Sequence, residues 1–276
     1  MQVQNSFKFN LEDLCSKKLI CATKPKSLAL GRRVFYWFEE HQQYWLKTQT
    51  LKSEKVLEDS FQHELEFYLS LTHQQAKNIT LPYQILSHSA VINHCGIAMP
   101  LLILPHAKCL FAESPQILSI DQIKNKMIQA LSTLENLHKA GWLHADLKKE
   151  HFIEYGKTAS LIDFEQSTKI QDTPNISTMN ATPRYMAPEL FHAEAKSIAS
   201  DIYALGIIFY EWLKQERLFA KNYYDWAVLH CQKLEIELPK AYLCFKRTLD
   251  AMLNKQKQHR LTDISALKMR LITENV

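Results

Sequence analysis

Hydrophobic residues in the first third of the chain occur in short runs bounded by polar turns, which is typical of β-strands. The clearest pair covers residues 34–38 and 44–47, with a polar turn between them. Further strands are expected at residues 28–31, 83–86 and 97–104. Residues 60–71 predict a helix, because their apolar positions recur at helical spacing. The pattern therefore predicts a small sheet with one helix.

The remainder of the chain has mainly helical periodicity. Ser119 and Gln122 form a predicted capping box for a long helix that ends at Gly141. A second apolar helix is expected to open at Ser200 or Asp201, either of which could be its N-cap, and to run to about Leu213. Helical spacing continues at residues 226–229, 242–253 and 262–271. The fold class expected is α+β, with no internal repeat.

Composition narrows the class of protein. With 276 residues and 46% hydrophobic content the chain can bury a large core. Its 33 basic and 29 acidic side chains leave a net charge of +4, so we expect no nucleic-acid partner. No apolar run is long enough for a signal peptide or a transmembrane segment, so a cytoplasmic location is expected. The six cysteines have no paired spacing that indicates zinc or disulfides.

The chemistry is concentrated at residues 137–166, where Asp146 and Asp163 each lie on a short turn beside apolar β-type residues. This arrangement suits a phosphate-handling site that needs one base and one metal ligand. The motifs HADLK at 144–148, LIDF at 161–164 and ATPRYMAPE at 181–189 resemble those of eukaryotic-type serine/threonine protein kinases. We expect a divergent, bacterial member of this family.

The resemblance covers nearly the whole chain. It implies a two-lobed kinase-like domain over residues 15–272, with a β-rich N-lobe at about 15–104, a hinge at about 99–106 and a helical C-lobe at about 107–272. The family binds ATP in the cleft between its lobes, together with Mg²⁺, and Mn²⁺ is an alternative metal. Oligomeric state is not indicated by the sequence.

In the N-lobe the resemblance assigns ATP-binding roles to Gly31, Val34, Lys47 and Glu64. Gly31 is the remaining glycine of a Gly-rich loop, and Val34 follows it at the family's spacing. Lys47 matches the phosphate-pairing lysine, and Glu64 its helical partner. Because Trp45 stands where the family has a small residue, either the adenine pocket is reshaped or Lys52 is the true lysine.

In the catalytic loop, Asp146 is expected to accept or orient the proton of the attacking hydroxyl, and Lys148 to neutralise charge on the phosphoryl group. His144 is expected to be a structural core residue. The resemblance also implies that Asp201 holds the backbone of this loop.

Three residues are candidate metal ligands. Asp163 matches the metal-binding aspartate of the family's DFG motif. Glu165 replaces the glycine of that motif, so it could add a second carboxylate, limit movement of Phe164 or simply face solvent. His151 stands where the family has asparagine, and its imidazole could contact phosphate, accept manganese or pack.

The ATPRYMAPE segment separates protein kinases from small-molecule kinases of the same fold. Thr182 is expected to reach toward Asp146 and Lys148. Glu189 is expected to form a buried ion pair with Arg260, and breaking such a pair costs about 3 to 5 kcal/mol. These features favour a protein substrate.

Two alternatives stay open. The His151-Phe152 pair resembles bacterial lipopolysaccharide core kinases, which phosphorylate sugars, and Glu165 also agrees with a small-molecule kinase. A pseudokinase that binds partners without turnover is the third possibility, because glycines are lost and His151 replaces an asparagine.

Overall fold

A computed structural model describes residues 19–29, 33–39, 43–49, 54–87, 99–172 and 182–273. The chain divides into two compact units. Unit 1 consists of Met1–Ala107 together with Ile162–Glu165, and unit 2 consists of Lys108–Leu161 together with Gln166–Val276. The short segment Ile162–Glu165 thus belongs to unit 1 although unit 2 surrounds it in the sequence.

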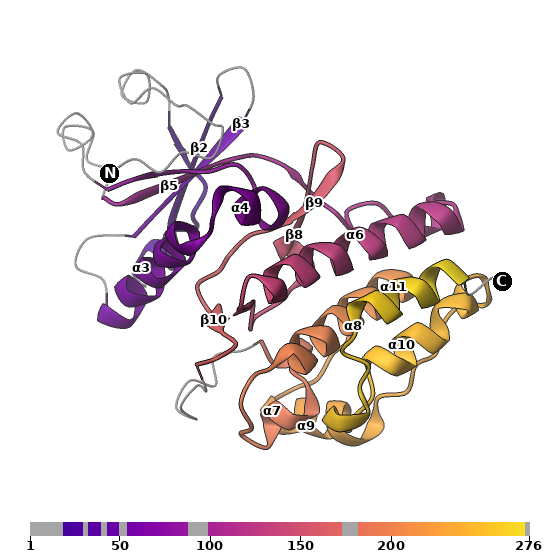
Figure 1. Cartoon of the computed structure of the whole chain (residues 1–276). Helices are drawn as coiled ribbons and strands as arrows, with labels where there is room; N and C mark the ends of the chain where they lie inside the picture. Colours follow the sequence, from indigo (N-terminus) through magenta and orange to yellow (C-terminus); the bar gives the residue numbers. More distant parts are fainter. Residues whose placement is uncertain are drawn as a thin grey trace. The chain divides into compact units, whose positions relative to one another are not determined.

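Unit 1 contains a five-stranded antiparallel sheet with the strand order β1-β2-β3-β5-β4. Figure 1 labels β2, β3 and β5 of this sheet. Its strands are β1 (Ile20–Cys21), β2 (Val34–Glu39), β3 (Gln43–Thr48), β4 (Gln84–Leu86) and β5 (Leu101–Pro105). In the central strand β3, Lys47 lies between Phe35 of β2 and Leu102 of β5. Most of the segment expected as a hinge is therefore strand β5.

One hydrophobic cluster lies on one face of the sheet. It is formed by Phe38, Tyr44, Leu46, Leu86, Leu101 and Ile103. Because side chains alternate along a strand, Tyr44 and Leu46 enter this core while Trp45 and Lys47 point to the other face. The alternation of side chains along β3 thus places Lys47 on the face of the sheet opposite this cluster.

The helices of unit 1 are α2 (Pro25–Ala29), α3 (Lys55–Ser70) and α4 (His73–Ile79). The strand expected at residues 28–31 is wrong over its described part, because Leu28 belongs to α2. Proline at the first helical position favours this turn, and the backbone N–H groups of Ser27 and Leu28 donate to the carbonyl of Lys24. Gly31 lies outside the described residues.

Unit 2 is mainly helical (Figure 1). Its helices are α6 (Ile120–Lys139), α7 (Pro188–Phe191), α8 (Ile198–Lys214), α9 (Tyr223–Val228), α10 (Lys246–Met252) and α11 (Ile264–Thr273). Helix α6 begins with the predicted capping box of Ser119 and Gln122. Helix α11 packs against α6, and α10 packs against the buried helix α8.

Short strands in unit 2 position its loops, and the sequence pattern did not predict their pairing. One sheet has the order β6-β8-β9, and β7 pairs with β10. These strands are β6 (Lys108–Cys109), β7 (Trp142–Leu143), β8 (Phe152–Tyr155), β9 (Thr158–Leu161) and β10 (Thr168–Lys169). Residues 144–151 follow β7, and residues 162–165 follow β9.

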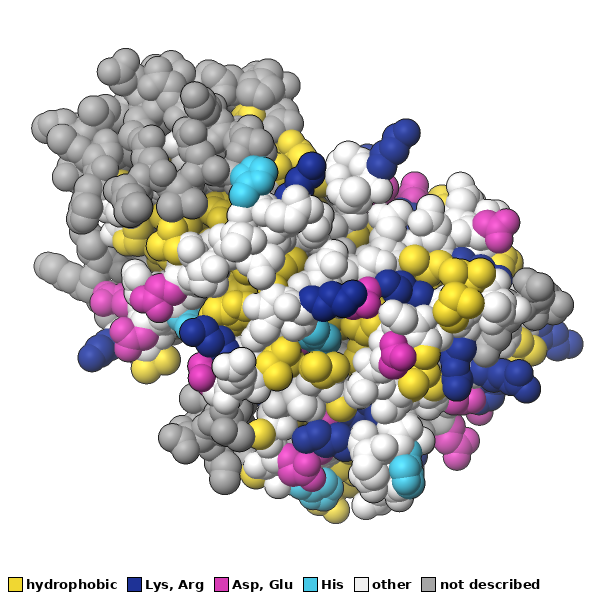
Figure 2. Space-filling model, viewed as in Figure 1, with side chains coloured by type: hydrophobic (Ala, Val, Ile, Leu, Met, Phe, Trp, Pro, Cys, Tyr) yellow, Lys and Arg dark blue, Asp and Glu magenta, His cyan; other side chains and the backbone are white. Residues whose placement is uncertain are grey.

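These elements confirm the expected fold class, which combines an N-terminal antiparallel sheet and helix with a helical C-terminal region. None of the helices in the described ranges has the length and apolar composition needed to cross a membrane. On the face that Figure 2 shows, Lys and Arg side chains are interspersed with Asp and Glu side chains, which agrees with the small net charge.

Candidate active site

Lys47 is the centre of a charged cluster in unit 1. Its Nζ lies 2.7 Å from Glu64 Oε2, 3.0 Å from Asp163 Oδ1 and 2.8 Å from Glu165 Oε1. The structure therefore places Lys47 with the partner that the sequence predicted, Glu64, whereas Lys52 lies outside the described residues. Burial opposes the charge on Lys47, but the three carboxylates outweigh it and raise the pKa of Lys47 well above its ordinary value.

Helix α3 decides which glutamate meets Lys47. Its buried face carries Phe61, Glu64, Leu65, Phe67 and Tyr68. Glu66 is exposed and accepts a hydrogen bond from Gln62, so it is not the partner. Burial raises the pKa of Glu64 to about 7, against the opposing effect of the Lys47 charge. Loss of Lys47 would therefore leave a buried carboxylate without its cation.

The loop Asp163-Phe164-Glu165 has a specific conformation. Asp163 has a positive φ of 68°, which aspartate tolerates better than most residues. The Phe164 ring stacks on Phe67 with centroids 3.9 Å apart, and its backbone N–H donates to Glu64 Oε1 at 3.2 Å. Helix α3 therefore holds the residue that follows Asp163.

Glu165 is bound by several side chains of unit 1. Its Oε1 accepts from Arg33 Nε at 2.8 Å and lies 2.8 Å from Lys47 Nζ, and its Oε2 accepts from Ser60 Oγ at 3.1 Å. The interpretation of Glu165 as a simple solvent-facing residue is therefore wrong. Sequence reasoning missed Arg33 and Ser60, because neither lies in a recognisable motif.

The carboxylates of Glu64, Asp163 and Glu165 form a candidate metal-binding group, with ligand atoms within 4.8 Å of one another. Carboxylate oxygens are the ligands that Mg²⁺ prefers, so this donor set fits the metal. His151 is not part of this group. It is buried in unit 2, where its ring stacks on His144 with centroids 5.3 Å apart.

In unit 2 the Asp146 carboxylate is bound on both oxygens. Oδ1 accepts from the Thr182 backbone N–H at 3.1 Å and from Thr182 Oγ1 at 3.0 Å. Lys148 Nζ lies 2.8 Å from Oδ2. The structure thus brings together the three residues that the sequence predicted to meet, and it fixes the direction of the Asp146 carboxylate.

Asp201 organises the backbone before Asp146. Its carboxylate accepts from the backbone N–H groups of His144 at 2.9 Å and Ala145 at 3.0 Å, and it lies 3.0 Å from His138 Nε2. Ala145 has a φ of 67°, a conformation that costs about 1 to 3 kcal/mol and needs such support. The N-cap of α8 is Ser197, so the N-cap interpretation of Ser200 or Asp201 is wrong. His138 was not predicted.

The pKa of Asp201 reflects these contacts. Burial alone would raise it, but hydrogen bonds from His138 and from the His144 backbone, together with the charges of these histidines, lower it on balance. Asp201 is therefore ionised, and its negative charge strengthens the hydrogen bonds that it accepts from the backbone N–H groups of His144 and Ala145.

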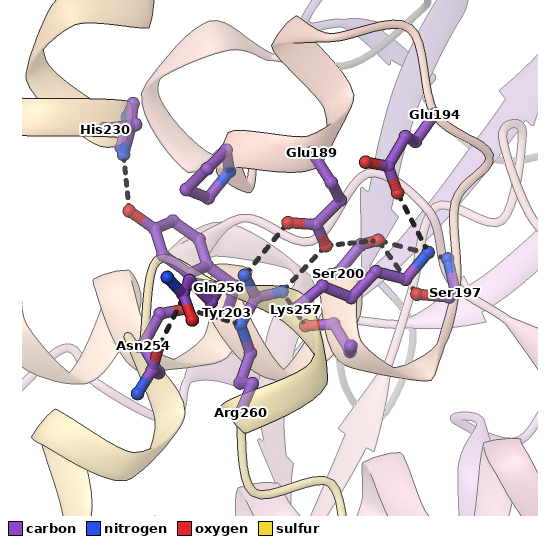
Figure 3. A network of polar contacts seen from close by, with 12 residues as sticks. Glu189, Glu194, Ser197, Ser200, Tyr203, His230, Asn254, Gln256, Lys257 and Arg260 are labelled. Carbon is purple, nitrogen blue, oxygen red and sulfur yellow. Dashed lines mark hydrogen bonds and ion pairs between the residues drawn. The ribbon is translucent and has the colours of Figure 1, made fainter.

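Glu189 and Arg260 form the predicted buried pair (Figure 3). Arg260 Nη1 and Nη2 lie 2.7 and 2.9 Å from the two carboxylate oxygens. Ser200 Oγ also donates to Glu189, and the guanidinium lies over the Tyr203 ring at 4.8 Å. These contacts join helices α7 and α8 to the segment before α11.

Lys196 is a further residue that the motifs did not indicate. It lines a cavity of about 20 Å³, a volume suited to one water molecule, together with Asp146 and Thr182. Burial lowers its pKa, although the charges of Asp146 and Asp201 oppose that effect. Lys196 and Asp146 therefore line the same small cavity.

The remaining predicted residues lie in β2 and β3. Val34 is buried and pairs with Thr48. Trp45 donates from its indole N–H to His106 Nδ1 at 2.6 Å, on the same face of β3 as Lys47. The Trp45 side chain therefore lies two residues before Lys47 on the same face of the strand.

Comparison with known proteins agrees with this geometry. Residues 34–272 match the family model described as protein kinase domain. The chain is 26% identical over 206 residues to the serine/threonine-protein kinase TIO of Arabidopsis thaliana. This aligned region covers 74% of this chain and 15% of that protein. It is 27% identical over 169 residues to the human serine/threonine-protein kinase Nek11. This aligned region covers 60% of this chain and 26% of that protein.

The chain thus spans about a quarter or less of the length of these two relatives. The family match covers most of the chain, and the structure has the corresponding sheet, helices and clusters of charged residues. Protein kinases generally use ATP and Mg²⁺. The chain belongs to the protein kinase family.

Proposed function

We propose that this chain is an ATP-dependent kinase that phosphorylates serine or threonine hydroxyls on protein. The observation that carries the proposal is the binding of both Asp146 oxygens by Thr182 and Lys148. A carboxylate held in this way has one direction from which it can accept the proton of a hydroxyl. The distant similarity to serine/threonine kinases supports the same substrate class.

The cluster in unit 1 supports nucleotide binding. Lys47 is a buried ammonium whose pKa is raised by the carboxylates around it, and it can pair with phosphate oxygens. Asp163, whose side chain is 36% exposed, is the carboxylate of the cluster most open to a metal. Mg²⁺ or Mn²⁺ would be held there, and when bound it would neutralise charge on the phosphates.

The other residues have supporting roles. Glu64 orients Lys47, Asp201 holds the backbone before Asp146, and Glu189 with Arg260 stabilises the helices that follow. Lys148 supplies positive charge beside Asp146 for the transferring phosphoryl group. The match to residues 34–272 supports the expected domain of residues 15–272. A cytoplasmic location and a bacterial source stay predictions.

The test is transfer of labelled γ-phosphate from ATP to a generic protein acceptor, with magnesium or manganese. We expect label on serine or threonine with the wild-type chain. Asp146→Asn should lower transfer about 10² to 10⁴-fold, the usual contribution of a general base, and Asp163→Ala should abolish metal-dependent transfer. Asp59→Asn, an exposed aspartate on α3, is the matched control.

Other outcomes would contradict the protein-kinase proposal. ATP consumption stimulated by a saccharide, without protein labelling, would identify a small-molecule kinase. ATP binding without transfer to any acceptor would identify a pseudokinase.

A further inference from the structure

The ammonium of Lys47 has no spare donor. A lysine ammonium carries three N–H groups, and Glu64, Asp163 and Glu165 each lie within 3.0 Å of Nζ. For Lys47 to bind a phosphate oxygen, one of these three carboxylates must give up its contact. The structure indicates which one.

Glu64 is the most costly carboxylate to separate from Lys47. Its side chain is 1% exposed, and an ionised carboxylate in that position needs a cation beside it. Asp163 is the residue that would hold the metal, so we expect it to keep its place 3.0 Å from Lys47 Nζ when nucleotide binds. Glu165 has a second cation at hydrogen-bond distance, because Arg33 Nε lies 2.8 Å from the same Oε1 that contacts Lys47.

Arg33 allows Lys47 to release Glu165 without leaving the Glu165 carboxylate unpaired. Its Nε donates to Oε1, the same oxygen that contacts Lys47, and Ser60 holds Oε2. If Lys47 leaves, Glu165 keeps both a cation and a hydroxyl donor. Its charge therefore stays compensated without Lys47.

Arg33 is itself held in place. The Nη1 group donates to Gln49 Oε1, and the guanidinium lies 5.0 Å from the centroid of the Phe61 ring. Its side chain is 8% exposed. A guanidinium fixed by a hydrogen bond and an aromatic ring loses little further freedom when it binds a carboxylate, so Arg33 is suited to a positioning role.

We propose that Arg33 is a positioning residue that holds Glu165 while Lys47 passes one N–H contact from Glu165 to a phosphate oxygen of a nucleotide. The inference rests on the proposed nucleotide binding in unit 1. Glu165 stands where the family has glycine, so the chain carries an additional carboxylate there, and the guanidinium of Arg33 compensates its charge. Without Arg33, Glu165 would stay on Lys47 and compete with phosphate.

The test is a double-mutant cycle measured by calorimetric titration of a non-hydrolysable ATP analogue in EDTA, without Mg²⁺, so that Glu165, a candidate metal ligand, is tested only as the competitor of phosphate for Lys47. Arg33→Gln should weaken binding roughly tenfold, the value of one charge-assisted hydrogen bond. Glu165→Gln should bind as tightly as wild type or more tightly, because the competitor has lost its charge. The double variant should return to within about threefold of wild type.

Further variants separate this role from a general loss of structure. Arg33→Lys should retain most of the affinity, because it keeps a cation near Glu165. Ser60→Ala should weaken binding by a smaller factor, which Glu165→Gln should also reverse. Lys77→Gln, an exposed cation on α4, is the matched control, and thermal unfolding of each variant verifies that it is folded.

The inference is overturned if the double variant binds as weakly as Arg33→Gln, or if Glu165→Gln alone is as weak. It is also overturned if the wild-type chain binds neither the analogue nor inorganic tripolyphosphate. Binding without phosphoryl transfer to any acceptor would instead contradict only the proposed kinase function. Restored binding in the double variant would support the transfer of the Lys47 contact from Glu165 to phosphate, whether or not the chain transfers a phosphoryl group.

Discussion

Glu189 and Arg260 lie 71 positions apart in the sequence and share two hydrogen bonds of 2.7 and 2.9 Å in the interior of unit 2. Both side chains are almost completely buried, at 3% and 0% exposure. Two opposite charges in that environment stabilise each other only as a pair, because either one alone would be desolvated without compensation.

Removal of one partner should therefore destabilise unit 2 strongly. We expect Arg260→Met to lower the free energy of unfolding by about 3 to 5 kcal/mol, measured by urea denaturation. Lys257→Gln, which removes the longer 3.6 Å pair with Glu194, should change it by less than about 1 kcal/mol. The double variant Glu189→Leu/Arg260→Met should be less destabilised than the sum of its single variants. Strict additivity would contradict the pairing.

Asp201 should stabilise the fold in a pH-dependent way. Since its pKa is lowered in the folded state, its contribution is complete above the unfolded value of about 3.9 and is lost as the pH falls through the folded value. We expect Asp201→Asn to cost about 1 to 3 kcal/mol at pH 7. The difference from wild type should shrink below about pH 4. Urea denaturation across this range checks it, with the exposed Asp250→Asn as control, and an unchanged difference would contradict it.

His230 should make the folded state sensitive to mild acid. It is fully buried, its Nδ1 lies 2.9 Å from the Tyr203 hydroxyl, and burial lowers its pKa to about 4. The unfolded chain takes up a proton near pH 6.5, whereas the folded chain does so only near pH 4, so stability falls as the pH drops through this window. The loss should reach about 3 kcal/mol.

The measurement is the free energy of unfolding at about pH 7 and about pH 5, compared between wild type and His230→Gln. The variant should be less stable at neutral pH, because its side chain fits the buried site less well, but it should lose less stability on acidification. His73→Gln, at an exposed position on α4, should behave as wild type. Equal pH dependence of wild type and His230→Gln would rule out this role.

Thr182 should affect catalysis through Asp146. Its N–H and its hydroxyl both donate to Asp146 Oδ1, so Thr182→Ala removes one of the two contacts and Thr182→Ser retains both. If Asp146 orients the acceptor hydroxyl, we expect kcat to fall roughly tenfold in Thr182→Ala, with KM for ATP little changed. Initial rates of phosphoryl transfer check this. Equal losses in the serine and alanine variants would show that the hydroxyl is not what matters.

Several site residues could be predicted because they lie in short motifs. Asp146 and Lys148 lie in the HADLK motif and Asp163 lies in the LIDF motif, and the resemblance of these motifs to those of protein kinases singled the three residues out. Thr182 and Asp201 were predicted to act on the same loop, and the structure places both in hydrogen-bond contact with it. Their geometry relative to a bound nucleotide stays a prediction.

Other contacts could not be predicted in this way. Arg33 meets Glu165 across 132 positions, and neither residue type at its position indicates the other. The expected strand was wrong over residues 28 and 29, because a short apolar run is compatible with either a strand or a turn of helix, and Pro25 favours the helix. His151 was considered as a metal ligand, but its ring packs against His144.

The sequence by itself indicated the fold class through its hydrophobic periodicity, and it indicated the family and the charged residues of the site through motifs that resemble those of protein kinases. Both kinds of signal are local properties of the chain. Only the tertiary structure decided that Lys47 is shared by three carboxylates and that Arg33 holds the third of them. The physical reason is that the energy of a buried charge depends on the whole set of charges around it, and folding brings that set together from distant segments.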